Sequence, residues 1–393
     1  WIRGGDVITA TKKTRARADV VVDGERIVHV GAVAPGLEAK ETIDATGLVV
    51  TPGFVDVHAH SDPYGGGEHL LAQGVTTIVV GQDGFSPAER IGAWLDRVQA
   101  SRPRVNVATL VGHHTVRATA GVGASPKPSD KSIGKMASLV DRAMREGAFG
   151  LSTGLEYEPG GLAGAEELAA IAEPVGRRNG VVMSHLRSED DDKIDASLTE
   201  LFEQCKAAKA RAHVAHIKIV LGKGTDRAAA LVARLDEARA GGLEVTADIY
   251  PYTASYTTIG ILFPPFAKPP NDYAAARSKQ RDALLDHLRA RVEKRNGPEA
   301  TLFGTGSYAG KTLADVARRE GRPFAEVLLE LGPSRVLRDG RDGDEGPLQG
   351  QIRHGRLGRR RRRPAPAWPR QLLARDRRPR GQREARHPRG VGA

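Results

Sequence analysis

Two patterns of apolar and polar residues divide the chain. Residues 1–50 alternate short apolar runs with turn residues, and Asp23-Gly24 between two such runs predicts a β-hairpin. From residue 51 an apolar run, a loop and an amphipathic helix follow one another repeatedly. Such alternation favours an α/β fold with a parallel sheet. We therefore predict part of a small β domain at 1–50 and a (β/α)₈ TIM-type barrel at 51–335.

Seven of the apolar runs predict barrel strands, and polar or glycine-bearing loop residues follow each of them. The predicted strands end near His60, Gly81, Gly112, Thr153, His185, Ile217 and Tyr250. A closed barrel needs an eighth strand. Residues 263–300 combine a Pro-rich entry with a charged helix. We expect them to be an insertion, either a lid over the barrel or a plain pair of surface helices.

The excess of positive over negative charge lies in the last part of the chain. From about residue 335 the sequence loses periodicity and fills with Arg, Gly and Pro, and residues 353–393 hold 15 arginines against two acids. This segment contributes +13 to a net charge of +11, which leaves −2 for residues 1–352. The body is therefore not basic, and nucleic acid is not an expected partner of it. Residues 336–393 are either a disordered basic tail or, as we favour, a stretch translated out of frame.

Cysteine content and hydropathy bear on the cellular location of the protein. No run of 18 or more apolar residues exists, so we expect no membrane-spanning helix. Cys205 is the only cysteine and lies in a helical pattern, which excludes an internal disulfide and a thiolate cluster. These features favour a reducing, cytoplasmic location.

His58-Ala-His60 ends the first barrel strand. Side chains at i and i+2 of a strand share a face, so both imidazoles would project together from the strand end. An H-x-H pair is often two polar residues in a turn, but here it follows a run that is apolar on both faces, as buried parallel strands are. The pair is therefore a candidate metal site.

Further ligands follow other strands. Barrel enzymes place their sites at the carboxyl ends of the strands, where this chain has Asp83, His185, and His213 or His216. Three residues apart on one strand, these last two face opposite sides; we choose His216 and expect His213 to face the helix layer. Four imidazoles and a carboxylate would suit one or two zinc ions. In the alternative interpretation Asp83 only caps its turn.

Six motifs carry a family resemblance. They lie at residues 55–60, 74–86, 147–160, 184–189, 215–218 and 247–255. Together they resemble the D-aminoacylases, or N-acyl-D-amino-acid deacylases, of the amidohydrolase superfamily, from about residue 2 to about 335. The resemblance implies an amidohydrolase barrel with a small β-sandwich domain and zinc-dependent hydrolysis of N-acyl-D-amino acids to a carboxylate and a D-amino acid.

The resemblance also implies site roles. His185 and His216 would hold the tighter metal, and His58 and His60 a weaker second one. The substrate would lie near Tyr157, Arg187 and Lys218, where a cation could bind the α-carboxylate.

Two positions depart from the family pattern. Asp83 stands where well-known members have a metal-binding cysteine, and carboxylate is a harder ligand than thiolate. The Ser-Asp-Gly at the end of the family's strand 8, whose aspartate is the general acid/base, is absent. Read with each codon's first base dropped, Leu357-Gly-Arg359 can give Ser-Asp-Gly. We therefore predict that strand 8, its catalytic aspartate and the C-terminal strands of the β domain are missing, and that activity is impaired.

Two other functions remain as alternatives. A dihydropyrimidinase-like or dipeptide amidohydrolase is one, although hydantoinase-like relatives bridge their metals with a carboxylated lysine on strand 4 and residues 148–153 contain no lysine. Nucleic-acid binding through the arginine-rich tail is the other, and it would weaken steeply with salt.

Overall fold

An N-terminal sheet lies within the region predicted to form part of a small β domain. The computed structural model describes residues 1–9, 15–33, 35–65, 67–220, 225–252, 254–333 and 351–354. The sheet contains β1 (Ile2–Ile8), β2 (Arg15–Asp23), β3 (Arg26–Gly31), β4 (Ile43–Asp44) and β5 (Val49–Val50). Its order is β3-β2-β1-β4, and β5 pairs with β1. Asp23 pairs with Arg26 across the predicted hairpin, and Gly24 adopts a φ of 59°, which glycine tolerates because it has no Cβ.

The described residues supply one layer of the predicted sandwich. Apolar side chains of this sheet remain open to solvent, including Ile27 at 66% and Val28 at 58% exposure. Such a face is normally covered by a second layer.

Parallel strands form the central part of the chain. They are β6 (Phe54–Asp56), β7 (Val75–Val80), β8 (Asn106–Thr109), β9 (Val111–Gly112), β10 (Gly150–Gly154), β11 (Val181–His185), β12 (Arg211–Val214) and β13 (Val245–Ala247). They pair in chain order as β6-β7-β8 and β9-β10-β11-β12-β13. Leu110 alone separates β8 from β9. Each of the seven predicted runs therefore contains a strand.

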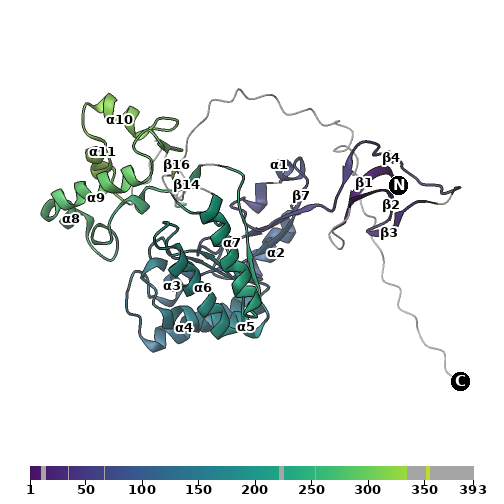
Figure 1. Cartoon of the computed structure of the whole chain (residues 1–393). Coiled ribbons are helices and arrows are strands. Elements are labelled where there is room, and N and C mark those ends of the chain that lie inside the picture. The colour runs from purple at the N-terminus through teal and green to yellow at the C-terminus, as the bar shows by residue number, and fades with distance from the viewer. Residues whose placement is uncertain are drawn as a thin grey trace, which may run out of the picture. The chain divides into compact units, whose positions relative to one another are not determined.

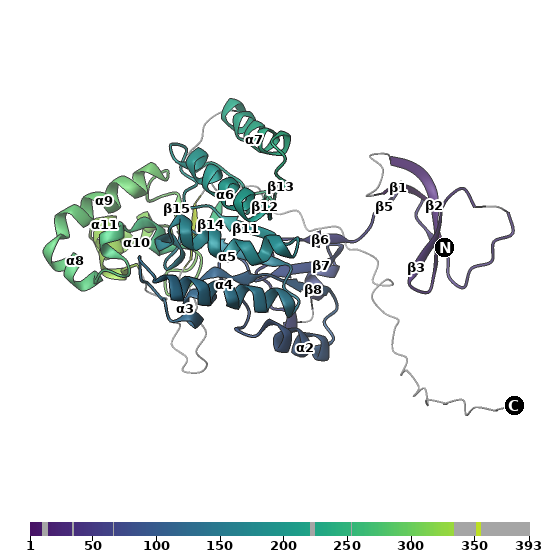
Figure 2. The ribbon, with the colours of Figure 1, turned by 90° about the horizontal axis from the view of Figure 1, so that it is seen from below.

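Helices follow the strands as predicted (Figures 1 and 2). They are α1 (Glu68–Leu71), α2 (Ile91–Ser101), α3 (His113–Ala120), α4 (Asp130–Arg145), α5 (Ala165–Arg177), α6 (Ile194–Ala208) and α7 (Thr225–Ala240), with 3₁₀ turns η1 (Pro63–Gly65) and η2 (Gly160–Leu162). The main core lies between the sheet and these helices, where Val182 and Val214 meet Ile171 and Leu198. Burial of these side chains holds the strand ends in place.

One prediction about strand faces is wrong. His213 was expected to face the helices, but Ala212 and Val214 on either side of it belong to the core beneath the helices. His213 is paired with Met183, which packs with Leu110 in a separate cluster. Because strand side chains alternate, His213 lies on the inner face of the sheet.

The first and last of these strands remain edges in the part of the chain that is described. No ladder joins β6 to β13 there. Phe54 and Val55 on β6 are 56% and 55% exposed. Unpaired edges expose backbone donors and acceptors. The predicted absence of strand 8 concerns residues that lie almost entirely outside the described ranges.

Residues 259–331 form a second apolar cluster. It combines η3 (Ile259–Leu262), η4 (Pro265–Ala267), α8 (Tyr273–Lys279), α9 (Arg281–Lys294), β15 (Thr301–Phe303), α10 (Leu313–Glu320) and α11 (Phe324–Leu331). The predicted insertion at 263–300 is thus the central part of a larger packing unit. Arg291 Nη1 lies 2.5 Å from Asp190 Oδ2 and Lys268 Nζ lies 3.0 Å from Glu158 Oε1, so ion pairs tie the unit to loops that follow barrel strands.

A third sheet joins distant segments. Here β14 (Ser255–Thr258) and β15 both pair antiparallel with β16 (Gln351–His354). The sequence predicted no regular element after about residue 335, and β16 is an exception to that prediction. The rest of the tail, residues 334–350 and 355–393, lies outside the described residues. No described helix is both long and apolar enough to cross a membrane.

Cys205 offers a test of the main core. Its side chain is fully buried in α6, and burial raises the pKa of the thiol to about 12. Because the thiolate is the reactive form, we expect the native chain to resist an aromatic disulfide reagent at pH 8. The single thiol should react after unfolding in denaturant, measured by absorbance. Rapid reaction of the native chain would contradict this packing.

Candidate metal centre

Four sheet strands bring the predicted ligands to one place. His58 and His60 follow β6, and Asp83 lies in the turn after β7. His185 is the last residue of β11, and His216 follows β12 by two residues. Carboxyl ends of neighbouring parallel strands meet at one edge, which explains the convergence.

Two of these residues have unusual backbone conformations. Asp83 has a φ of 53° and His216 a φ of 35°, both in the left-handed region. Non-glycine residues seldom adopt this region, although aspartate and histidine are found there more often than most. Backbone strain of this kind concentrates at functional sites.

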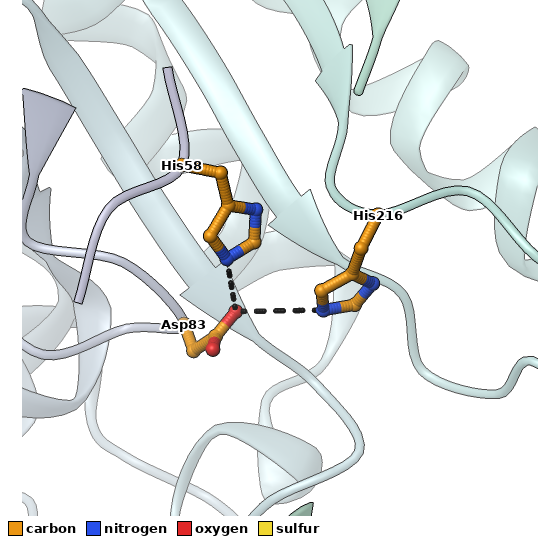
Figure 3. Close-up of side chains that lie close together, drawn as sticks. All are labelled: His58, Asp83 and His216. Carbon is orange, nitrogen blue, oxygen red and sulfur yellow. Dashed lines mark ion pairs between the residues drawn. The ribbon is translucent and has the colours of Figure 1, made fainter. Parts of the chain in front are cut away.

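Asp83 Oδ1 is the centre of the group. It lies 3.9 Å from His58 Nε2, 3.7 Å from His185 Nδ1 and 3.9 Å from His216 Nε2. Figure 3 shows Asp83 between His58 and His216, which approach it from different strands. These separations are somewhat longer than the roughly 3.3–3.5 Å between ligand atoms in a tetrahedral zinc site, given bonds of about 2.0–2.1 Å. Ligand atoms of His58, Asp83 and His216 lie within 4.8 Å of one another, and so do those of His185, Glu189 and His216, so His216 belongs to two candidate metal-binding groups.

Each of these imidazoles has a carboxylate at its other nitrogen. His58 Nδ1 is 3.1 Å from Asp248 Oδ2, His185 Nε2 is 3.1 Å from Glu156 Oε2, and His216 Nδ1 is 3.0 Å from Glu189 Oε1. A histidine that binds metal usually donates its other ring N–H to such a partner, which fixes the tautomer. The ring nitrogens that face Asp83 are the ones through which these histidines would bind a metal.

Two buried polar atoms of this centre have no hydrogen bond to any described residue. They are Asp83 Oδ1 and His185 Nδ1. Burial alone would raise the pKa of Asp83, but the nearby imidazoles of His185 and His60 hold that pKa well below its ordinary value. A buried, charged acceptor without a donor is costly unless another cation neutralises it. The donor set thus fits a divalent metal.

His60 occupies a more open position. Its side chain is 66% exposed, and its Nε2 lies 3.3 Å from Asp83 Oδ2. The two oxygens of Asp83 therefore face different imidazoles. This arrangement allows one ion near Oδ1 and a second, more exposed one near Oδ2.

The three predicted substrate residues differ in their surroundings. The Tyr157 ring centroid is 4.6 Å from that of His185, and Lys218 Nζ is 2.6 Å from Glu189 Oε1 and 2.9 Å from His216 Nδ1. Both lie beside the candidate ligands. Arg187 instead donates to the Glu200 carboxylate and to the carbonyls of Gly161 and Ala163. Its guanidinium thus braces the loop that follows Tyr157.

The sequence did not single out several residues of this centre. They are the carboxylates Glu156, Glu189 and Asp248. All three lie within or beside the predicted strand ends, which was the available signal. Their roles as partners of the imidazoles could not be predicted, because the contacts join residues as far apart as His58 and Asp248.

Comparison with known proteins agrees with this geometry. Residues 41–322 match the model of the amidohydrolase family. The chain is 34% identical over 369 residues to an N-acyl-D-glutamate deacylase of Alcaligenes xylosoxydans xylosoxydans, covering 88% of this chain and 70% of the relative. It is 32% identical over 362 residues to a D-aminoacylase of the same organism, covering 86% and 69%.

A solved structure is also similar. The crystal structure of N-acyl-D-glutamate deacylase from Bordetella bronchiseptica, in complex with zinc and a phosphonate inhibitor, matches with a TM-score of 0.71 at 28% identity. The match covers 90% of this chain and 70% of that one. The fold therefore has a counterpart among known structures, and that counterpart was solved in complex with zinc.

The chain belongs to the amidohydrolase family. Within that family it resembles the N-acyl-D-amino-acid deacylases over most of its length, which confirms the resemblance predicted from the six motifs. The predicted barrel fold is likewise confirmed.

Proposed function

We propose that this chain is a zinc-dependent hydrolase of N-acyl-D-amino acids, which releases a carboxylate and the free D-amino acid. The convergence of three imidazole nitrogens on Asp83 Oδ1 is the observation that carries this proposal. Similarity to deacylases of this substrate class supports the reaction. Zinc, when bound, would supply polarisation of the amide carbonyl and acidification of water.

The chain's own residues would prepare the site for that chemistry. His58, His185 and His216 would hold zinc together with Asp83, and His60 would complete a second, weaker position. Glu156 accepts from the outward nitrogen of His185, so that the inward nitrogen of this ring would ligate. The outward nitrogen of His216 lies between the Glu189 carboxylate and the Lys218 ammonium group.

Substrate would bind beside the ligands. Lys218 Nζ lies next to His216 and above the Tyr250 ring at 5.6 Å, so it presents a cation near the reacting position. A carboxylate of the substrate would compete with Glu189 for that ammonium group. Arg187, held by Glu200, would act by supporting the loop of Tyr157.

Proton delivery is the weak step of this chain. The Ser-Asp-Gly that the resemblance places at strand 8 does not occur in the sequence. A missing general acid lowers turnover by a factor of roughly 10²–10⁴. We therefore propose substrate recognition and zinc binding with slow hydrolysis.

Substrate choice tests the proposal. We expect zinc-loaded chain to bind N-acetyl-D-glutamate or another N-acetyl-D-amino acid more tightly than its L-enantiomer, measured by calorimetry. Prolonged incubation at high protein concentration should release the D-amino acid slowly, measured by chiral chromatography. Preference for dihydropyrimidines or for the L-enantiomers would contradict the proposal.

Metal binding gives an independent test. We expect His185→Asn and His216→Asn each to weaken zinc binding by at least about tenfold, because each removes a ligand. His69→Asn is the matched control, since His69 is an exposed residue of α1. Competition with a chromophoric chelator measures the affinities. Equal zinc affinity in all three variants would show that the cluster is not the metal site.

A further inference from the structure

We propose that Asp248 is a positioning residue that holds two metal ligands, His58 and His216, in place. Through the same contacts it joins the two edge strands of the barrel. The inference rests on the proposed metal centre. Asp248 follows β13, whereas its partners follow β6 and β12. Its side chain is 15% exposed.

One oxygen of Asp248 orients His58. Oδ2 lies 3.1 Å from His58 Nδ1, and a carboxylate can only accept, so Nδ1 carries the proton. Nε2 of the neutral ring then has a free lone pair and faces Asp83 Oδ1. Asp248 thereby selects the tautomer of His58 that can bind a metal through Nε2.

The other oxygen fixes His216. Oδ1 accepts the backbone N–H of His216 at 2.7 Å. His216 has a φ of 35°, a conformation that needs support from its surroundings. This bond secures the turn after β12 and thus the approach of the His216 ring to Asp83.

Hydrogen bonds on the inner face of the sheet, from Thr246 to His213 and from His213 to Asp248, provide a third contact to Asp248. Thr246 Oγ1 lies 2.7 Å from His213 Nδ1, and His213 Nε2 lies 2.9 Å from Asp248 Oδ2. The hydroxyl of Thr246 can donate to Nδ1, which leaves the His213 proton on Nε2 for Asp248. Asp248 therefore receives three N–H donors, from His58, His213 and His216, without conflict.

These contacts cross the gap between the edge strands. Among described residues no ladder connects β6 with β13, yet His58 after β6 and Asp248 after β13 are 3.1 Å apart. A polar contact here holds the ends of strands that are 190 residues apart in sequence. The metal ligands on the two sides of the gap can then keep a fixed spacing.

Asp248→Asn is an informative substitution because its amide cannot satisfy all three donors. If the amide oxygen faces His216, the NH₂ group confronts the N–H groups of His58 and His213. If the oxygen faces the two rings, the NH₂ group confronts the His216 amide. We expect zinc affinity to fall by about 10–100-fold, the usual effect of losing such a partner.

A spectroscopic measurement separates orientation from general stability. In metal-free full-length chain labelled with ¹⁵N-histidine, a two-bond ¹H–¹⁵N spectrum above pH 8 reports each neutral tautomer. We expect His58, assigned with His58→Gln, to be an Nδ1–H tautomer in the wild type and to gain Nε2–H form in Asp248→Asn. Asp141→Asn is the matched control, because Asp141 also accepts several donors but contacts only arginines on α4 and at the C-terminal end of α5.

Thr246→Val covers the case in which Asp248→Asn does not fold. This exposed change removes only the hydroxyl that fixes His213, so we expect a mixed tautomer at His213 and a smaller loss of zinc affinity. If Asp248→Asn folds, an unchanged His58 tautomer together with wild-type zinc affinity would overturn the inference. If it does not fold, an unchanged His213 tautomer and unchanged zinc affinity in Thr246→Val would overturn it. Failure of the wild type to bind zinc would contradict the proposed function instead, and the metal-free tautomers would still decide the role of Asp248.

Discussion

The centre depends on the pairing of each inward-facing imidazole with a carboxylate on its outward side. Asp248 and Glu156 accept from His58 and His185, Glu189 Oε1 lies 3.0 Å from His216 Nδ1, and the opposite nitrogens face Asp83. A histidine without such a partner would divide its population between tautomers and rotamers. The order of the site therefore comes from the ring of acids around it as much as from the ligands.

This arrangement concentrates negative charge in a buried place. Asp83, Asp248 and Glu189 lie within contact of the same group of imidazoles, and each keeps a low pKa because its burial is outweighed by nearby donors. Lys218 neutralises part of the charge at Glu189. A divalent cation among the ligands would neutralise the rest, so the electrostatics and the geometry favour the same occupant.

The sequence was sufficient for the strands and for the identity of the candidate ligands, since a buried strand followed by a histidine leaves a clear pattern. It was less reliable once a strand ended. Strand alternation predicted that His213 faces the helices. However, β12 ends at Val214 and the backbone at His216 has a positive φ, so both histidines lie toward the inner face of the sheet. Strand parity does not extend past the last paired residue.

Which residues contact one another in the folded chain could not be predicted from the sequence pattern. Asp248 belongs to the motif at residues 247–255, yet nothing in the sequence indicates that it contacts His58 across the barrel. Arg187 shows the converse case, because a cation in a family motif is engaged by Glu200 and two backbone carbonyls. In both cases, long-range packing determines which donor meets which acceptor.

An anomalous difference map from a zinc-soaked crystal, recorded at the zinc edge, would test the central claim most directly. Zinc bound at the proposed centre would give a peak enclosed by His58, Asp83, His185 and His216, with nitrogen and oxygen ligands at about 2.0–2.2 Å and no sulfur. A zinc peak elsewhere, with this cluster unchanged and empty, would contradict it.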